Sequence, residues 1–313
     1  MYEVLAEVVR NGFVESRHYG SVAGLAPDGT LAHVRGNVEE TVLPRSTTKP
    51  FQALACLRAG APLAGERLAI AAGSHTGEDF HVKTVEGILS DAGLSVDALQ
   101  CPASWPEDEP TKASLIRAGE GESRVRMNCS GKHAGMLAAC AANGWPFGTY
   151  LSPEHPLQLA VEQVMADCAG EEPSPVAVDG CGAPLFGLTL AGLARAARSL
   201  VLSEEARPVA DAMRAHPEYV GGTEHANTAF MRALPGSVAK GGAEGVFVAA
   251  TAEGHAVAVK VIDGSPRATT AIALRALAAL GADTAPAAPL GAVPVLGGGR
   301  PVGEIRTTEE GRT

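Results

Sequence analysis

A serine and a lysine stand three residues apart near the N-terminus, as Ser46 and Lys49. We predict a helix over 46–57, and residues three apart share a helix face, so the amine can reach the hydroxyl. A neutral lysine amine can accept the serine proton while the hydroxyl attacks a carbonyl carbon. The same spacing recurs at Ser237 and Lys240, but two glycines follow it, which is not how a helix begins. The first pair therefore indicates acyl transfer, with a plain N-cap serine as the alternative.

A second group of polar residues follows a short apolar run. The run Leu68–Gly73 predicts a buried strand, and Ser74 and His75 come directly after it. Catalytic groups are often mounted where a strand ends. Hydroxyl groups in such a turn also satisfy backbone groups, so a purely structural turn is the alternative.

Two cysteines, Cys129 and Cys181, each lie in a polar turn rich in glycine. Such a pair could form a disulfide, supply a nucleophile beside His133, or provide half of a zinc site. A zinc site needs four ligands, and only two thiols are evident, so Lys132, a carboxylate or water would have to complete it. Turns with no chemical role are the remaining interpretation.

Lysine is scarce in this chain, since only six of the 25 basic residues are lysines. Three of them, Lys49, Lys132 and Lys240, lie beside Gly, Ser or Pro, where chemistry is often placed. Lysine can lose its proton in a protein and arginine cannot. This favours a role for these three lysines as bases or ligands, although six lysines can also fall at such positions by chance.

The composition indicates a soluble protein that handles small molecules. The 313 residues are 46% hydrophobic and 19% charged, with no apolar run long enough to span a membrane. A net charge of −10 without a basic cluster, and only 4% aromatic residues, argue against a nucleic-acid partner. The start of the chain lacks the features of a secretory signal, so we expect a cytoplasmic protein whose six cysteines are free thiols.

The order of predicted elements favours an α+β fold with a mixed or antiparallel sheet. We expect residues 1–313 to form a single catalytic unit, with two intimate subdomains as the alternative. The segment 101–124 is rich in Pro and Glu and suits a lid or an exposed connection. Strands are predicted within 2–43, at 68–73 and 177–182, in a hairpin over 245–262 and at a sheet edge over 301–306. Helices are predicted at 46–57, 79–92, 132–143, 155–169, 185–199, 204–215 and 269–280.

Four motifs, in this order along nearly the whole chain, resemble those of the Rhizobium etli-type, or class 3, L-asparaginases, also called asparaginase II. The motifs are Arg-Ser-x-x-Lys-Pro-Phe-Gln from Arg45, Gly-Ser-His-x-Gly-Glu from Gly73, Asn-Cys-Ser-Gly-Lys-His-x-Gly from Asn128, and Asp-Gly-Cys-Gly-x-Pro from Asp179. The resemblance implies a fold similar to serine β-lactamases and glutaminases, with a mixed sheet flanked by helices. It also implies a homodimer that hydrolyses L-asparagine to L-aspartate and ammonia.

The resemblance further implies two Ser–Lys tandems, Ser46 with Lys49 and Ser74 with Lys240. Ser46 is then the favoured nucleophile. The resemblance also implies a Zn²⁺ ion near the substrate. Its role could be to modulate substrate affinity, to take part in catalysis or to stabilise the structure. The implied zinc ligands are Cys129, Lys132 and Cys181, and the implied substrate contacts are Arg45, His133 and Asp179.

Other functions stay open from the sequence. A related Ser–Lys amidase could act on glutamine or a β-lactam-like amide, since one methylene is worth only about 1–3 kcal/mol in a pocket. A non-catalytic protein that binds an amino acid or zinc is a further alternative. The presence of both serines and of the three motif lysines weighs against a decayed site.

Overall fold

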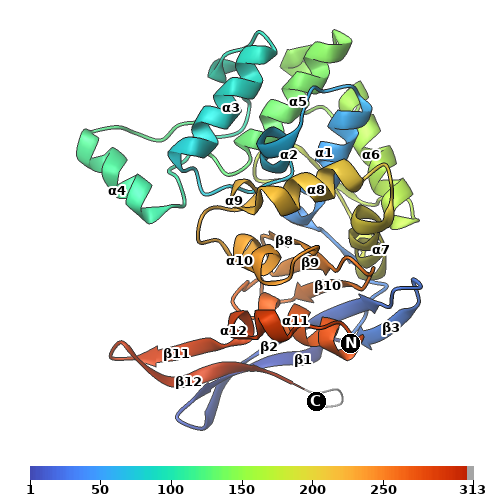
Figure 1. The fold of residues 1–313 in the computed structure, drawn as a ribbon, viewed down its shortest axis with the longest axis vertical. Helices are drawn as coiled ribbons and strands as arrows, with labels where there is room; N and C mark the ends of the chain where they lie inside the picture. Colours follow the sequence, from blue (N-terminus) through green and yellow to red (C-terminus); the bar gives the residue numbers. More distant parts are fainter. Residues whose placement is uncertain (309–313) are drawn as a thin grey trace.

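The computed structural model describes residues 1–308, and its centre is an eight-stranded sheet (Figure 1). The strand order is β11-β12-β1-β2-β10-β9-β8, with β3 pairing with β2, and every pair is antiparallel. The strands are β1 Glu3–Arg10, β2 Phe13–Leu25, β3 Leu31–Arg35, β8 Val238–Gly242, β9 Val246–Ala250, β10 Ala256–Val261, β11 Val293–Gly297 and β12 Arg300–Thr307. Two short pairs lie outside this sheet: β4 Thr41–Val42 with β7 Leu188–Thr189, and β5 Val176–Val178 with β6 Pro184–Phe186.

Helices cover both faces of the sheet and form a thick layer beyond its β8 edge (Figure 1). They are α1 Lys49–Arg58, α2 Gly65–Ala71, α3 Asp79–Asp91, α4 Glu109–Ala118, α5 Ser130–Asn143, α6 Pro156–Ala169, α7 Leu190–Leu202, α8 Arg207–Ala215, α9 Pro217–Val220, α10 Ala226–Ala233, α11 Thr269–Ala279 and α12 Ala288–Gly291. A 3-10 turn, Arg45–Thr48, leads directly into α1. Within residues 1–308, no helix has the length and apolarity needed to cross a membrane.

The sheet is buried on both faces because α7 and α11 pack on it from opposite sides. Both helices contact β2, β9 and β10. Every residue of β10 except Lys260 is accordingly buried, instead of alternating as in a sheet with one wet face. The buried residues of the sheet and of the helical layer form one continuous core.

The helical layer is held together by close approach of its helices. Gly131 and Gly135 of α5 face α2, and a Cβ at Gly131 would lie 2.6 Å from the Ile70 carbonyl oxygen. Small residues at this crossing bring the start of α5 against the end of α2. Ser74 follows the end of α2, and the 129–133 segment lies at the start of α5.

The α+β class predicted from the sequence is confirmed, while several elements differ from their predictions. The apolar run at Leu68–Gly73 belongs to helix α2, because a helix segment buried on all sides has no polar face to reveal its period. The predicted helix over 185–199 begins only at Leu190, after β6 and β7. The segment 101–124 contains α4.

The C-terminal hairpin also differs from its prediction. Strand β12 lies between β11 and β1 and is not at the sheet edge. The edge strand β11 escaped prediction because Pro294 and the Ala/Pro-rich stretch before it are typical of a linker.

Candidate active site

Two buried lysines meet at one serine where the helical layer adjoins the sheet. Lys49 is the first residue of α1, Lys240 lies in the edge strand β8, and Ser74 follows α2. The Ser74 Oγ accepts hydrogen bonds from Lys49 Nζ at 2.7 Å and from Lys240 Nζ at 2.9 Å. Each lysine is only 1% exposed. The predicted partners Ser74 and Lys240 are therefore in contact, and Lys49 joins them.

The environment of Lys240 favours its neutral amine. Burial lowers the pKa of Lys240 well below its usual value, and the charge of Lys49 lowers it further. Besides Ser74, the Lys240 Nζ donates to the Gly241 carbonyl at 2.7 Å. An amine that is unprotonated near neutral pH and within hydrogen-bond reach of a hydroxyl can act as a general base.

The backbone around Ser74 leaves no freedom in its position. The Ser74 N–H donates to the Val220 carbonyl at 2.8 Å. A Cβ on Gly73 would lie 2.6 Å from the Tyr219 carbonyl oxygen, so only glycine allows this approach. His75 is fully buried and holds the turn from the other side, since its Nε2 lies 2.8 Å from Ser130 Oγ. The histidine of this motif thus has a structural role.

A cavity of about 670 Å³ opens next to the two lysines. Ser46 lies in the 3-10 turn before α1, and its side chain lines this cavity together with Ser74. The lining also includes Asn128, Glu107, His225, Asn227 and Lys240. Cavities of this size accommodate small organic ligands. Both predicted serines thus lie at one cavity with one of the two lysines.

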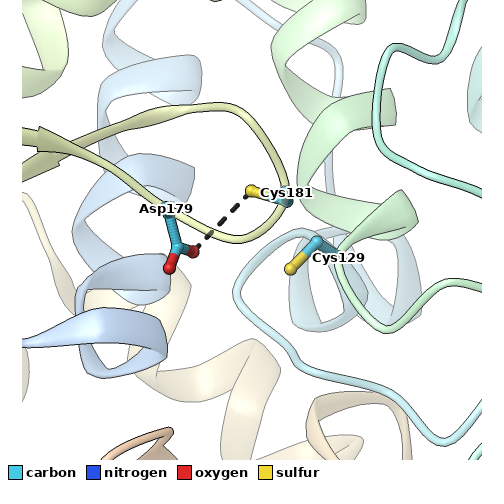
Figure 2. A group of neighbouring side chains, drawn as sticks. All are labelled: Cys129, Asp179 and Cys181. Carbon is cyan, nitrogen blue, oxygen red and sulfur yellow. Dashed lines mark hydrogen bonds between the residues drawn. The ribbon is translucent and has the colours of Figure 1, made fainter.

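A second cluster of predicted residues joins the start of α5 to the turn between β5 and β6. Figure 2 shows Cys129 on the first element, with Asp179 and Cys181 on the second. One ligand atom from each of these three residues lies within 4.8 Å of the other two. Lys132 Nζ donates to Cys181 Sγ at 3.0 Å, and the Cys181 thiol lies 3.7 Å from Asp179 Oδ2.

Opposite charges are paired within this cluster. A hydrogen bond from Cys181, together with Lys49 and Lys132, holds the pKa of Cys129 well below its usual value in spite of burial. Burial opposes the charge of Lys132, but the two neighbouring sulfur atoms raise its pKa. Burial likewise opposes the charge of Asp179, yet Lys132 and Arg45 lower its pKa. These shifts favour a thiolate at Cys129, a carboxylate at Asp179 and an ammonium group at Lys132.

The donor atoms of the cluster are of kinds that bind zinc. Two thiols and a carboxylate are accepted Zn²⁺ ligands, and a fourth position is filled by water or substrate in many zinc enzymes. Asp179, predicted as a substrate contact, is the third member of this donor group. Lys132, predicted as a ligand, lies beside it as a cation, and its amine would have to lose a proton to bind metal.

Arg45 connects the two clusters. Its backbone has φ of +53°, a left-handed conformation that is costly for a residue with a side chain. In this conformation its Nε donates to Asp179 Oδ1 at 2.8 Å. Because Ser46 is the next residue, the same turn orients the carboxylate of one cluster and the hydroxyl of the cavity.

His133, predicted as a substrate contact, lies in the interior of the protein. It is fully buried, and burial lowers its pKa well below the usual value. Its Nδ1 lies 2.6 Å from the Tyr150 hydroxyl, which accepts a hydrogen bond from the Gln100 N–H. Among the residues that the structure describes, none hydrogen-bonds to the buried Nε2 of His133.

Some site residues carry no signal in the sequence. The Asn128 carbonyl accepts from Lys49 Nζ at 3.3 Å, and Glu107 accepts from the Asn128 amide at 2.6 Å. Asn128 stands in a predicted motif, but Glu107 and Asn227 stand in segments without one. They were missed because only the tertiary fold brings them to the cavity.

Comparison with solved structures returns partial likenesses of shape. They include Mglu in its native form (15% identity, 83% of this chain and 63% of that one, TM-score 0.44). They also include a beta-lactamase from Mycobacterium bovis (17% identity, 83% and 94% covered, TM-score 0.46) and a Bacillus glutaminase (14% identity, 79% and 84% covered, TM-score 0.44). This chain spans less than two thirds of the length of Mglu.

Comparison with other sequences is decisive at the level of the family. Among curated proteins, none matches this chain. The sequence pattern of the L-asparaginase II family, in contrast, matches residues 6–307 and so contains both clusters of the site. The chain belongs to the L-asparaginase II family.

Proposed function

We propose that the protein hydrolyses the side-chain amide of L-asparagine to L-aspartate and ammonia through an acyl-enzyme. The observation that carries this proposal is the contact of two buried lysine amines with the hydroxyl of Ser74. A serine hydroxyl with a neutral amine beside it can attack a carbonyl carbon itself or pass on the proton of a second serine that attacks. Family membership points the same way. The proposal includes membership of the Rhizobium etli-type subclass.

In the proposed first step, a serine Oγ attacks the amide carbon, the C–N bond breaks, and the leaving nitrogen takes a proton and departs as ammonia. Ser46 is the favoured nucleophile from the resemblance, and it is one of the residues that line the cavity. Ser74 and Lys240 then form the path that accepts its proton, with Lys49 holding Ser74 from the other side. In the second step, water attacks the ester carbon, releases aspartate and returns the proton to the serine.

We propose that Cys129, Lys132 and Cys181 hold a Zn²⁺ ion, as the resemblance implies, with Asp179 as an alternative donor. A bound Zn²⁺ supplies a positive charge that can orient a carbonyl or carboxylate group of the substrate. Cys129, Cys181 and Asp179 themselves supply three donors close together. Arg45 fixes the orientation of the Asp179 carboxylate through its 2.8 Å hydrogen bond.

The homodimer implied by the resemblance and the cytoplasmic location expected from the sequence are further parts of the proposal. Light scattering on the purified protein tests the dimer. A single species with the mass of the 31.9 kDa chain would contradict it.

Ammonia release from L-asparagine and, separately, from L-glutamine tests the proposed reaction. The assay is run on metal-free protein and again after zinc is added. We expect release from asparagine, with zinc changing KM more than kcat. Release from glutamine alone would transfer the same mechanism to the longer amide. No ammonia from either substrate under both conditions would overturn the proposal.

A further inference from the structure

Four histidines of this protein accept a backbone hydrogen bond at Nδ1, and one of them differs from the rest at its second nitrogen. In His75, His81, His155 and His225, the Nδ1 accepts a hydrogen bond from a nearby backbone N–H. An Nδ1 that accepts leaves the proton on Nε2, so each neutral ring presents an Nε2–H donor. These four rings can therefore be compared directly.

In three of the four, the Nε2–H group meets an oxygen atom of the protein. The partners are Ser130 Oγ at 2.8 Å, the Glu218 carbonyl at 2.9 Å and the Pro146 carbonyl at 3.2 Å, for His75, His81 and His155 respectively. For His225, no residue among 1–308 accepts from Nε2. Its ring lines the cavity that also holds Ser46, Ser74 and Lys240.

The position of the His225 ring is fixed. His225 is the N-cap residue of α10, and its Nδ1 accepts from the Asn227 N–H at 3.1 Å. The ring packs on Gly221, where a Cβ would lie 2.6 Å from Nδ1. The Gly221 carbonyl in turn accepts from the Thr76 N–H at 2.7 Å. The donor is therefore anchored to the loop that carries Ser74.

Asn227, in the first turn of the same helix, offers a second donor at the cavity. Its side chain is only 1% exposed, and its Oδ1 accepts from the Gly241 N–H at 3.0 Å, which assigns the other side-chain atom as the amide nitrogen. That Nδ2 is buried and has no hydrogen-bond partner within the described part of the chain. Buried donors without a partner are uncommon, and a bound ligand atom or water usually accounts for them.

We propose that the first turn of α10 binds a carboxylate group of the substrate through the His225 Nε2–H and the Asn227 amide. Two fixed N–H donors at a helix N-terminus match a carboxylate, because the helix dipole also favours negative charge there. Burial is the main cause that lowers the pKa of His225 to about 4, so the ring stays neutral and donates from Nε2. The carboxylates of Glu107 and Glu224 line the same cavity and suit the ammonium group of an amino acid.

The inference rests on the proposed function only in taking an amino acid as the substrate. Its test uses His225→Asn, which keeps a side-chain acceptor for the N-cap bond but is too short to replace Nε2. A second variant, Asn227→Asp, keeps the acceptor for Gly241 and puts an oxygen in place of the donor. His155→Asn is the matched control, because His155 caps α6 in the same way.

The binding of L-aspartate by calorimetry and the kinetics of ammonia release are measured for all four proteins. A hydrogen bond to a charged group corresponds to a loss of about 10- to 100-fold in affinity. We expect losses of this size in Kd for aspartate and in KM for asparagine, with a smaller change in kcat, for His225→Asn and Asn227→Asp. His155→Asn should bind and react as the wild type does.

The outcomes separate this inference from the proposed function. An active wild type whose two α10 variants keep its Kd and KM overturns the carboxylate site alone. A wild type that binds aspartate, loses binding in the variants and releases no ammonia overturns the proposed reaction and supports the site. A wild type that neither binds aspartate nor releases ammonia overturns both.

Discussion

Replacement of Lys240 by methionine should lower kcat and, at neutral pH, raise the free energy of unfolding. Lys240→Met removes the amine that contacts Ser74 Oγ at 2.9 Å. Loss of a general base lowers kcat by about 10²- to 10⁴-fold. Lys240→Arg should lose as much, because a guanidinium group keeps its proton. Lys112→Met, which changes a partly exposed lysine of α4, is the control and should leave kcat unchanged.

The effect on stability follows from the lowered pKa of Lys240. At a pH between this lowered value and the usual 10.5, the unfolded chain holds a proton on Lys240 that the folded protein lacks. The free energy of unfolding of the wild type therefore rises with pH through this window, by up to about 1.4 kcal/mol per pH unit. The loss of stability caused by burying the Lys240 amine is complete below the pKa of Lys240 in the folded protein. It vanishes above the pKa of this residue in the unfolded chain. Lys240→Met lacks both the penalty and this slope.

Urea unfolding of the wild type and of Lys240→Met, at several values between about pH 7 and pH 10, measures the slope. We expect the methionine variant to be the more stable at neutral pH and the two proteins to converge as the pH rises. Parallel curves would refute the argument that Lys240 is folded as a neutral amine. Retention of a tenth of the wild-type kcat by Lys240→Arg would refute its role as the base.

Three further predictions concern the serines, the thiol cluster and the helix crossing. Ser46→Ala and Ser74→Ala should each lower kcat by about 10²-fold or more, since one hydroxyl carries the acyl group and the other relays its proton; a fully active variant in the ammonia assay would remove that serine from the mechanism. Cys129→Ser should abolish tight binding of Zn²⁺ measured by calorimetry on metal-free protein, and unchanged affinity would exclude this cluster as the site. Gly131→Ala should lower the free energy of unfolding by about 1–3 kcal/mol because no room exists for its Cβ. Gly148→Ala, where the surroundings are open, is the control in the same urea titration.

The sequence singled out Lys49, Ser74 and Lys240, which meet in the structure, but residue spacing did not indicate how they pair. Spacing predicted that Lys49 would serve Ser46, since the two are three residues apart. In the structure Ser46 belongs to a 3-10 turn and Lys49 opens the α-helix, so the geometry of one continuous helix does not apply. The Lys49 amine instead reaches Ser74, which a distant part of the fold supplies. Pairing of this kind depends on tertiary packing, and local spacing carries no information about it.

The fold was predicted best where periodicity is local. Helices such as α3 and α6 and the hairpin of β9 and β10 have clear periods and turn residues, and they lie close to their predicted positions. The order of strands in the sheet, with β12 beside β1, could not be read from the chain because the two strands lie far apart in sequence and β12 has no clear apolar alternation. The proposed role of His225 could not be read from the chain for a similar reason, since a single histidine has no pattern.

The strand pairing around β1 and β2 determines how late during translation the sheet can be completed. Strands β1 and β2 are made first, yet β10 and β12, which complete their pairing, are made last. Throughout synthesis of the helical layer, the exposed edges of the first hairpin have no permanent partner, and such edges readily join to those of other chains. Lys240 arrives in the same late portion of the chain. The site around Lys240 is therefore completed only near the end of translation. At the same stage the hairpin of β1 and β2 gains its remaining partners, and its edges no longer promote aggregation.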